Sequence, residues 1–338
     1  MPSISRSPVL FRLVLLLALV VLGAASLNYG ALQLDHTAWL TPDSDQGRVL
    51  YQLRLPRLLL TLFAGALLAA TGAAAQSLFR NPLADPSLIG VSAGAALAVV
   101  TLMVFAGGWL VQHRFAEFAM PLTAFMGGLA STWLVMRLSR SLAGVSVTTL
   151  LLTGMAINAI AMAGIGALKY LSDELTLRQA SFWLMGNFSV QGWMPVIVLT
   201  CVAFPVLLLL AREGRELNLL LLGVSQAQLL GVDVAKLQRR LVVLCALGVG
   251  SVVAFGGLIS FVGLIVPHLV RLLSGPDNRH LLPHSALLGA FFLSLADLLS
   301  RMLASPAELP IGILTALVGG PFFLFVLLYR MRRGGGYA

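Results

Sequence analysis

Apolar runs long enough to cross a membrane recur along the whole chain, with short polar intervals between them. A spanning α-helix needs roughly 20 mostly apolar residues. The pattern predicts an all-α polytopic membrane protein with about ten transmembrane helices, forming one domain over residues 1–338. The alternating segments of a membrane β-barrel, ~10 residues each, are absent from the sequence. The expected runs cover about residues 13–27, 53–75, 89–110, 120–138, 149–168, 195–211, 241–259, 261–273, 286–299 and 311–328.

Glycines interrupt the apolar pattern near residues 256–263, so one or both helices on either side are expected to be short or broken. Composition supports a membrane location, because 59% of the residues are hydrophobic and only 10% are charged. A soluble domain carries about 25% charged residues. The mean hydropathy of +0.94 agrees with this assignment.

The net charge of +9 does not indicate a nucleic-acid partner, because the arginines stand at the ends of apolar runs and form no basic face. With both termini in the cytoplasm, 15 of the 22 Lys and Arg residues fall on the cytoplasmic side. This distribution satisfies the positive-inside rule, and the inverted topology violates it. Membrane lipid is therefore the expected surrounding.

The first run follows Arg6 and Arg12 and leaves two interpretations open. The small residues at 23–26 could mark the cleavage site of a signal peptide. We favour an uncleaved first helix, because the rest of the chain is also embedded in the membrane. Cys201 and Cys245 lie in apolar runs without CxxC spacing, which indicates packing rather than a disulfide or a metal site.

A polar loop within residues 77–94 separates two of the longest runs. Pro82 and Pro86 lack a backbone N–H and disfavour helix in the preceding residue, so non-helical backbone is expected here. Gly90 and Gly94 stand four residues apart on one helical face, which suits close helix–helix contact. Irregular backbone at a membrane boundary is tolerated where it packs in protein or lines an aqueous path. The alternative is an ordinary turn.

Residues 212–240 form the longest polar interval and contain one short amphipathic segment. Its apolar positions repeat at helical spacing, at Val224, Ala227 and Leu230. Ser225 is expected to cap this helix and Gly231 to end it. Such a helix either docks a partner protein or lies on the membrane surface.

No nucleotide-binding motif is present. A P-loop needs Gly-Lys-Ser/Thr after a glycine-rich turn, and the two lysines, Lys169 and Lys236, do not follow glycine. We expect that the chain is not an enzyme and that ATP hydrolysis would belong to a separate subunit. A membrane-embedded enzyme or an ion-coupled secondary transporter would need convergent titratable groups or intramembrane carboxylates. The acidic residues stand at run ends, and the five histidines lack metal-ligand spacing: His36, His113, His268, His280 and His284.

The polar loop also carries a family resemblance. Asn81–Pro86 followed by Leu88–Gly94 resembles the signature of the FecCD/BtuC-type permeases, the membrane subunits of ABC importers for ferric siderophores, haem and cobalamin. Residues 263–271, 307–312 and 319–321 extend this resemblance. It implies a BtuC-like fold with ten helices and cytoplasmic termini in a bacterial inner membrane. It also implies a homodimer with two cytoplasmic ABC ATPase subunits and a periplasmic substrate-binding protein.

The resemblance implies roles at matching positions on the cytoplasmic side. The positions of the cytoplasmic gate are Asn81, Leu83, Val147 and Thr148, in the loops after the second and before the fifth helix. Val147 departs from the small hydroxyl residue that is common there. The positions that contact the ATPase are Ser225, Ala227, Leu230 and Gly231. Ordinary loop packing is the alternative for the gate residues.

On the outer side, Arg54 and Arg57 share one face at the start of the second helix. The resemblance implies that both, with Arg301, contact acidic residues of the binding protein, which would steer encounter and fix register. The alternative is an interfacial anchor whose charged end reaches water. Glu308 is expected to be buried or paired, with Arg301 as its candidate partner.

The segment 169–186 bears on the substrate. Its Leu-Ser-Asp-Glu turn, Leu177-Arg178 and Phe182-Trp183 resemble the haem-importing branch of the family. The chain is expected to bind no resident cofactor or metal, with haem as transported substrate and ATP used by the partner subunit. A ferric siderophore and, less favoured, cobalamin are the alternative substrates.

Overall fold

The computed structural model of the chain describes residues 8–30, 34–112, 116–141, 144–145, 147–189, 192–305 and 307–332. Arg6 and His113 lie outside these ranges. The α-helices are α1 (Pro8–Asn28), α2 (Asp45–Arg48), α3 (Leu55–Leu78), α4 (Val91–Gln112), α5 (Ala116–Leu138), α6 (Val147–Leu171), α7 (Glu174–Leu184), α8 (Met194–Arg212), α9 (Gly214–Leu221), α10 (Val224–Leu229), α11 (Val234–Gly256), α12 (Val262–Ser274), α13 (Asn278–Met302) and α14 (Ile311–Arg332). The two strands, β1 (Arg140–Ser141) and β2 (Gly144–Val145), pair antiparallel.

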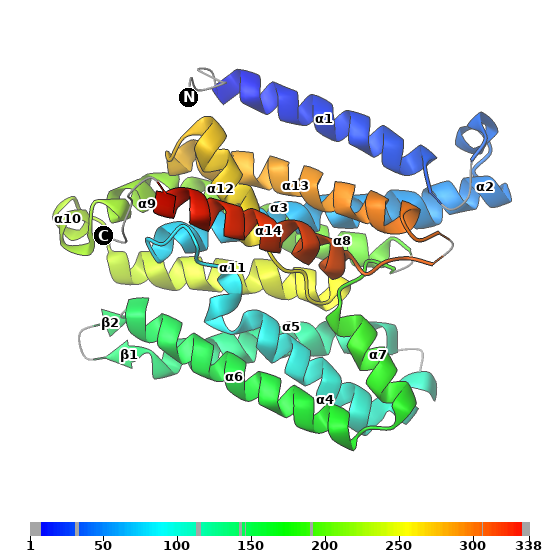
Figure 1. Ribbon diagram of the computed structural model, residues 1–338, viewed down its shortest axis with the longest axis horizontal. Coiled ribbons are helices and arrows are strands. Elements are labelled where there is room, and N and C mark those ends of the chain that lie inside the picture. Colours follow the sequence, from blue (N-terminus) through cyan, green and yellow to red (C-terminus); the bar gives the residue numbers. More distant parts are fainter. Residues whose placement is uncertain are drawn as a thin grey trace.

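The long helices run side by side and give the molecule two distinct ends (Figure 1). One end carries α10, the start of α1 and the end of α14, and we call it the α10 end. The other end carries α2 and α7, and we call it the α7 end. Helices α4, α5 and α6 form one group, and α11 packs between this group and α3.

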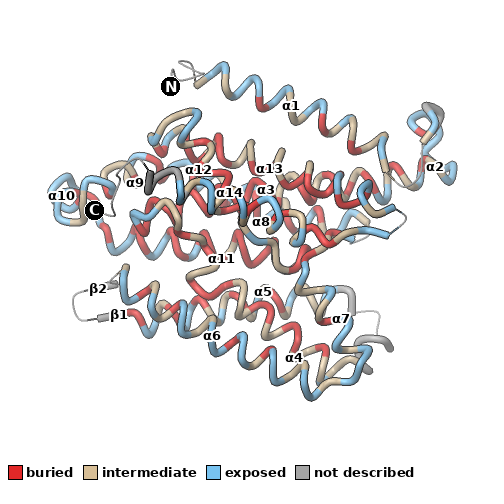
Figure 2. The backbone as a smooth tube through the Cα atoms, viewed as in Figure 1, coloured by how far each residue is buried: buried red, intermediate tan, exposed pale blue. Residues whose placement is uncertain are grey.

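Helix α3 is the centre of the bundle. It continues from α2 through the π-helical turn η2 (Val49–Arg54), so that Asp45–Leu78 is one helical stretch, and every residue from Ala64 to Leu78 is buried. Helices α8, α11, α12 and α13 pack around it. Figure 2 shows the buried residues concentrated in α3 and these neighbours, whereas α1 is largely exposed.

Small residues allow the neighbours of α3 to approach its backbone. A Cβ on Gly65 would overlap the carbonyl of Gly289 in α13, and a Cβ on Gly289 would overlap that of Gly65. A Cβ on Gly72 would likewise overlap the carbonyl of Gly263 in α12. Lipid is as apolar as a leucine side chain, so membrane helices associate mainly through such close packing.

Seven helices among the described residues are long and apolar enough to cross a membrane. Three shorter apolar helices, Val91–Gly107, Val262–Ser274 and Ile311–Val326, add to them. The expected short helix near residue 263 is confirmed, because α12 has 13 residues. The loop after α3 was expected to be non-helical, but it contains the 3₁₀ turn η3 (Pro86–Ile89). Proline is favourable in the first turn of a helix, which explains this difference.

We predict that Gly72→Ala destabilises the protein by about 1–3 kcal/mol, because the added methyl group overpacks the α3–α12 contact. The matched control is Gly166→Ala on α6, where nothing lies within 4 Å of the new Cβ. This control should be neutral or slightly stabilising, because alanine favours helix. Thermal unfolding in detergent measures both, and equal midpoints for the two variants would contradict the prediction.

Candidate functional site

The loop from Phe79 to Gly90 breaks the helical path between α3 and α4, and its own side chains shape it. The Asn81 N–H donates to the carbonyl of Gln76 at 3.0 Å. The Oδ1 of Asn81 accepts from the Leu83 N–H at 2.9 Å. Asn81 therefore stabilises the turn through hydrogen bonds to residues before and after it. The family resemblance assigns this turn to the cytoplasmic gate.

The second half of the loop is closed by Asp85. Its Oδ1 accepts from the Ser87 N–H at 2.8 Å and caps the turn η3. That turn ends at Gly90, whose φ of 84° suits only glycine without strain. Ser131 of α5 donates to the Gly90 carbonyl at 2.9 Å, and a Cβ on Gly94 would overlap the Ser131 side chain. The expected close contact at both glycines is confirmed.

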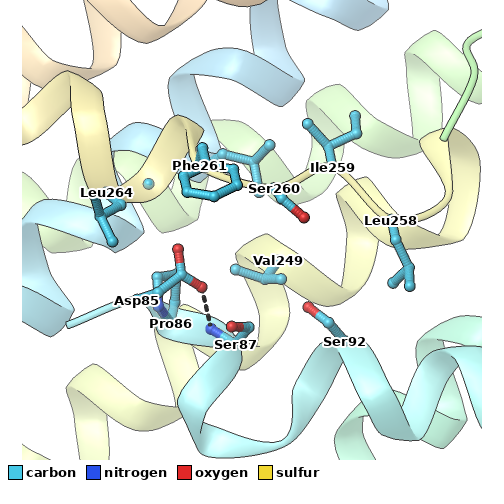
Figure 3. Close-up of a pocket in the computed structure, with 12 residues that line it drawn as sticks. Asp85, Pro86, Ser87, Ser92, Val249, Leu258, Ile259, Ser260, Phe261 and Leu264 are labelled. Atoms are coloured by element: carbon cyan, nitrogen blue, oxygen red, sulfur yellow. Dashed lines mark hydrogen bonds between the residues drawn. The ribbon is translucent and has the colours of Figure 1, made fainter. Parts of the chain in front are cut away.

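Asp85 also faces a cavity of about 300 Å³ between η3, α4, α11 and the segment that leads into α12. Figure 3 shows its carboxylate and the hydroxyls of Ser92 and Ser260 bordering the same space. Phe261 borders it as well and has a φ of 68°, an uncommon backbone conformation for a bulky side chain. The second half of the loop thus packs on a partly polar cavity, whereas Arg80 and Asn81 are exposed.

Helix α6 packs against η3 and holds it from the other side. A Cβ on Gly154 would overlap the carbonyl of Leu88, and the Asn158 Nδ2 donates to the carbonyl of Ser87 at 3.2 Å. Val147 and Thr148 were placed in a loop before the fifth helix, but they form the first turn of α6. The helix begins two residues before the expected start of the run at Thr149, and Val147 is itself apolar.

The amphipathic segment expected to dock a partner forms α10 at the α10 end (Figure 1). The predicted cap at Ser225 is wrong, because the cap position is two residues earlier, at Gly223 with φ 125°, and α10 begins at Val224. The predicted end at Gly231 is confirmed by its φ of 87° and by its N–H bond to the Gln228 carbonyl at 3.0 Å. Ala227 is fully buried, whereas Leu229 is 88% exposed and Leu230 is 58% exposed.

A cluster of charged side chains lies near the α7 end. The Arg57 Nε donates to Asp297 Oδ1 at 2.8 Å, and its Nη1 lies 2.9 Å from Glu308 Oε2. The Arg301 Nε lies 3.2 Å from Asp297 Oδ2, in an ion pair without hydrogen-bond geometry. The expected pairing of Glu308 with Arg301 is therefore wrong. Glu308 pairs with Arg57 instead, because the side chain of Arg301 lies against Asp297 of its own helix.

Two of the arginines also hold the end of α1. The Arg54 Nη1 donates to the carbonyls of Leu27 and Asn28 at 2.8 and 2.9 Å. The Arg301 Nη2 donates to Ser26 Oγ at 2.7 Å. Arg54 and Arg301 are buried, so both arginines join α1 to the helices behind it.

A model of the FecCD transport family matches residues 11–329 of the chain. The chain belongs to the FecCD transport family. It is a polytopic membrane permease of the FecCD/BtuC type, a subunit of ABC importers whose ATPase activity resides in separate subunits.

Related proteins match this FecCD permease over nearly its full length. The hemin transport system permease protein HmuU of Yersinia pestis is 43% identical over 324 residues, covering 95% of this chain and 96% of that protein. The vitamin B12 import system permease protein BtuC of Vibrio vulnificus is 39% identical over 316 residues, covering 94% and 93%. A solved structure of an inward-facing metal-chelate type ABC transporter covers 96% of this chain and 100% of its own, with 35% identity and a TM-score of 0.83.

The structure of the FecCD permease brings the predicted residues together at its two ends rather than at one site. Sequence reasoning assigned no role to Asp85, although a carboxylate inside a membrane protein is itself a signal of function. It also missed Gln76, whose Nε2 donates to the Leu264 carbonyl at 3.1 Å and whose Oε1 accepts from Arg271 at 2.8 Å. No local spacing could reveal that contact, because 195 residues separate Gln76 from Arg271.

We predict that Asp297→Asn lowers the free energy of unfolding of the FecCD permease by about 3–5 kcal/mol, because it removes the buried anion between Arg57 and Arg301. The matched control is Asp233→Asn. This change removes an exposed ion pair with Lys236, which contributes little to stability, and an asparagine still caps α11. Thermal unfolding in detergent compares them, and similar midpoints would refute a stabilising role of Asp297.

Proposed function

We propose that the chain is the permease subunit of an ATP-driven haem importer. It works as a homodimer with two cytoplasmic ABC ATPase subunits and a periplasmic binding protein. The observation that carries this proposal is the 43% identity to a hemin permease over almost the full length of both proteins. The likeness to vitamin B12 permeases keeps cobalamin as an alternative, and a ferric siderophore is the other.

The proposed topology has ten crossings in a bacterial inner membrane, with the α10 end and both termini in the cytoplasm. The seven long apolar helices and three shorter ones support this count. The exposed Leu229 and Leu230 of α10 would then face the ATPase. The 79–90 loop and the first turn of α6 would close the path toward the cytoplasm by alternating access.

The α7 end would face the periplasm, and its exposed side chains suit a flat apolar ligand. Tyr170 is 89% exposed, and Leu171, Leu175 and Phe182 are also exposed around α6 and α7. Arg178 lies over the ring of Phe182 at 5.9 Å. An apolar surface with one nearby cation fits the tetrapyrrole face and the acidic edge of haem.

We predict ATP-dependent uptake of haem into proteoliposomes that contain this chain, its ATPase and its binding protein. Ferric siderophore and cobalamin, offered separately, should give much slower uptake. The double variant Tyr170→Ala, Phe182→Ala should slow haem uptake several-fold, whereas Phe204→Ala, an exposed aromatic residue of α8, should not. Uptake of only a siderophore or cobalamin would replace haem as the substrate, and no uptake of any of them would reject the proposal.

Docking of the binding protein near the predicted residues Arg54, Arg57 and Arg301 is part of the same proposal, with Arg57 as the residue that exchanges partners, because Arg54 and Arg301 are buried against α1. These arginines already have internal partners, so an acidic partner would compete with Glu308 for Arg57. Glu308 is the accessible member of the cluster, with 36% of its side chain exposed. An incoming carboxylate could replace it without disturbing Asp297.

We predict that Glu308→Gln tightens binding of the binding protein several-fold at low salt, because it frees Arg57 for the partner's carboxylate. The matched control is Glu174→Gln, which removes the same charge from an exposed residue of α7 with no ion pair among the described residues. Surface-immobilised binding at two salt concentrations measures both. An equal gain in the two variants would show a general charge effect and contradict docking at Arg57.

A further inference from the structure

A chain of polar contacts joins α9, which leads directly into α10, to the start of α13. The Oδ1 of Asn218 accepts from both the N–H and the Nδ2 of Asn278, each at 2.9 Å. The Nδ2 of Asn218 donates to Asp277 Oδ1 at 2.6 Å. Only one orientation of the Asn218 amide satisfies these partners, because its oxygen meets two donors and its nitrogen meets a carboxylate.

Asp277 remains an anionic anchor for this amide at neutral pH. The Arg279 Nη2 lies 2.8 Å from Asp277 Oδ2, and this pairing holds the pKa of Asp277 well below its ordinary range. Partial burial acts in the opposite direction and is outweighed. Asp277 is therefore ionised over the whole neutral range and remains an acceptor for the Asn218 Nδ2.

Asn278 carries the chain of contacts on to α3. Its Oδ1 accepts from the Ser77 Oγ at 2.7 Å, and both residues are buried. The carbonyl of Ser77 accepts from the Arg80 N–H at 3.2 Å, and that of Gln76 accepts from the Asn81 N–H at 3.0 Å. The turn of α3 that receives Asn278 is thus the turn that holds the beginning of the 79–90 loop.

Helix α9 is held by close contacts with α13 and α11, so a displacement of α9 would be passed on to its partners. A Cβ on Gly214 would lie 2.9 Å from the Cα of Arg279, so α9 and α13 meet backbone to backbone. Arg240 of α11 pairs with Glu213 at 3.0 Å and with Glu216 at 3.1 Å. Burial raises the pKa of Glu213, and the nearby Arg240 opposes this shift.

We propose that Asn218, Asn278 and Ser77 are positioning residues that transmit a displacement of α9 and α10 to the 79–90 loop. The inference rests on the proposed function, in which the ATPase moves α10 and this loop closes the path. Buried hydrogen bonds are suited to transmitting a displacement. If one helix slid past the other, the hydrogen-bonding groups would be left buried without partners, whereas apolar surfaces can slide without this cost. The alternative is that these residues only stabilise the fold, and the experiment has to distinguish this role from transmission.

The decisive variant is Ser77→Ala, which removes the Asn278 contact and little volume. Ser77→Thr keeps the hydroxyl and serves as the rescue. The matched control is Ser251→Ala in α11, a buried serine whose hydroxyl donates to the Gly248 carbonyl of its own helix. Asn218→Ala breaks the same chain from the α9 side and provides a second, independent variant.

Each complex is reconstituted with the ATPase and the binding protein, and haem uptake and ATP hydrolysis are measured together. Ser77→Ala and Asn218→Ala should assemble normally and hydrolyse ATP within twofold of the parent rate. Their haem uptake per ATP hydrolysed should fall at least fivefold, and Ser77→Thr and Ser251→Ala should retain it. The double variant should lose no more than either single variant, because both changes break one chain of contacts.

A nitroxide label at position 83 reports the mobility of the 79–90 loop and needs no substrate. It is attached to Leu83→Cys in a chain that also carries Cys201→Ser, which removes the exposed native cysteine. ATP should change the mobility of the label in the parent complex and not in Ser77→Ala. Unchanged uptake per ATP, or an unchanged ATP response of the label, would overturn the inference. A parallel decrease in complex assembly, ATP hydrolysis and haem uptake would also overturn the inference, because it would indicate a purely structural role. A parent complex that takes up no haem would instead reject the proposed function, and the label would still test the contacts.

Discussion

Gly65 of α3 and Gly289 of α13 meet backbone to backbone, and Gly72 meets Gly263 of α12 in the same way. Close packing has to hold a bundle together where lipid offers no hydrophobic driving force. The small residues along α3 allow it to be surrounded on all sides and nearly fully buried. The other long helices contact this axis directly or through α11 and α13, and α6 is placed through α4, α5 and the turn η3.

Polar groups are concentrated at the two ends of the bundle and serve different purposes there. At the α7 end, three arginines and two carboxylates join α1, α3 and the end of α13. Removing one member of such a cluster leaves an uncompensated buried charge, so Arg57, Arg301 and Asp297 depend on one another. At the α10 end, amides and hydroxyls connect α9, α13 and α3 in a line that ends at the 79–90 loop.

Sequence patterns predicted the helical membrane fold, the irregular loop at 79–90, the short α12 and the turn at Gly231, because each depends on local composition. The errors concern single residues, one through the local backbone and one through a distant partner. Ser225 has the chemistry of a cap, but Gly223 reaches a backbone conformation that starts α10 earlier. Glu308 and Arg301 are close in sequence, yet Glu308 pairs with Arg57, 251 residues away.

The sequence by itself determined that this protein is a helical membrane permease of its family, because hydropathy and a contiguous motif are written in neighbouring residues. Only the tertiary structure decided which arginine meets which carboxylate. It also decided that Asn218, Asn278 and Ser77 lie in one chain of contacts. These pairings depend on how α3, α9 and α13 cross in space, and their crossing depends on small residues whose partners are far away in sequence.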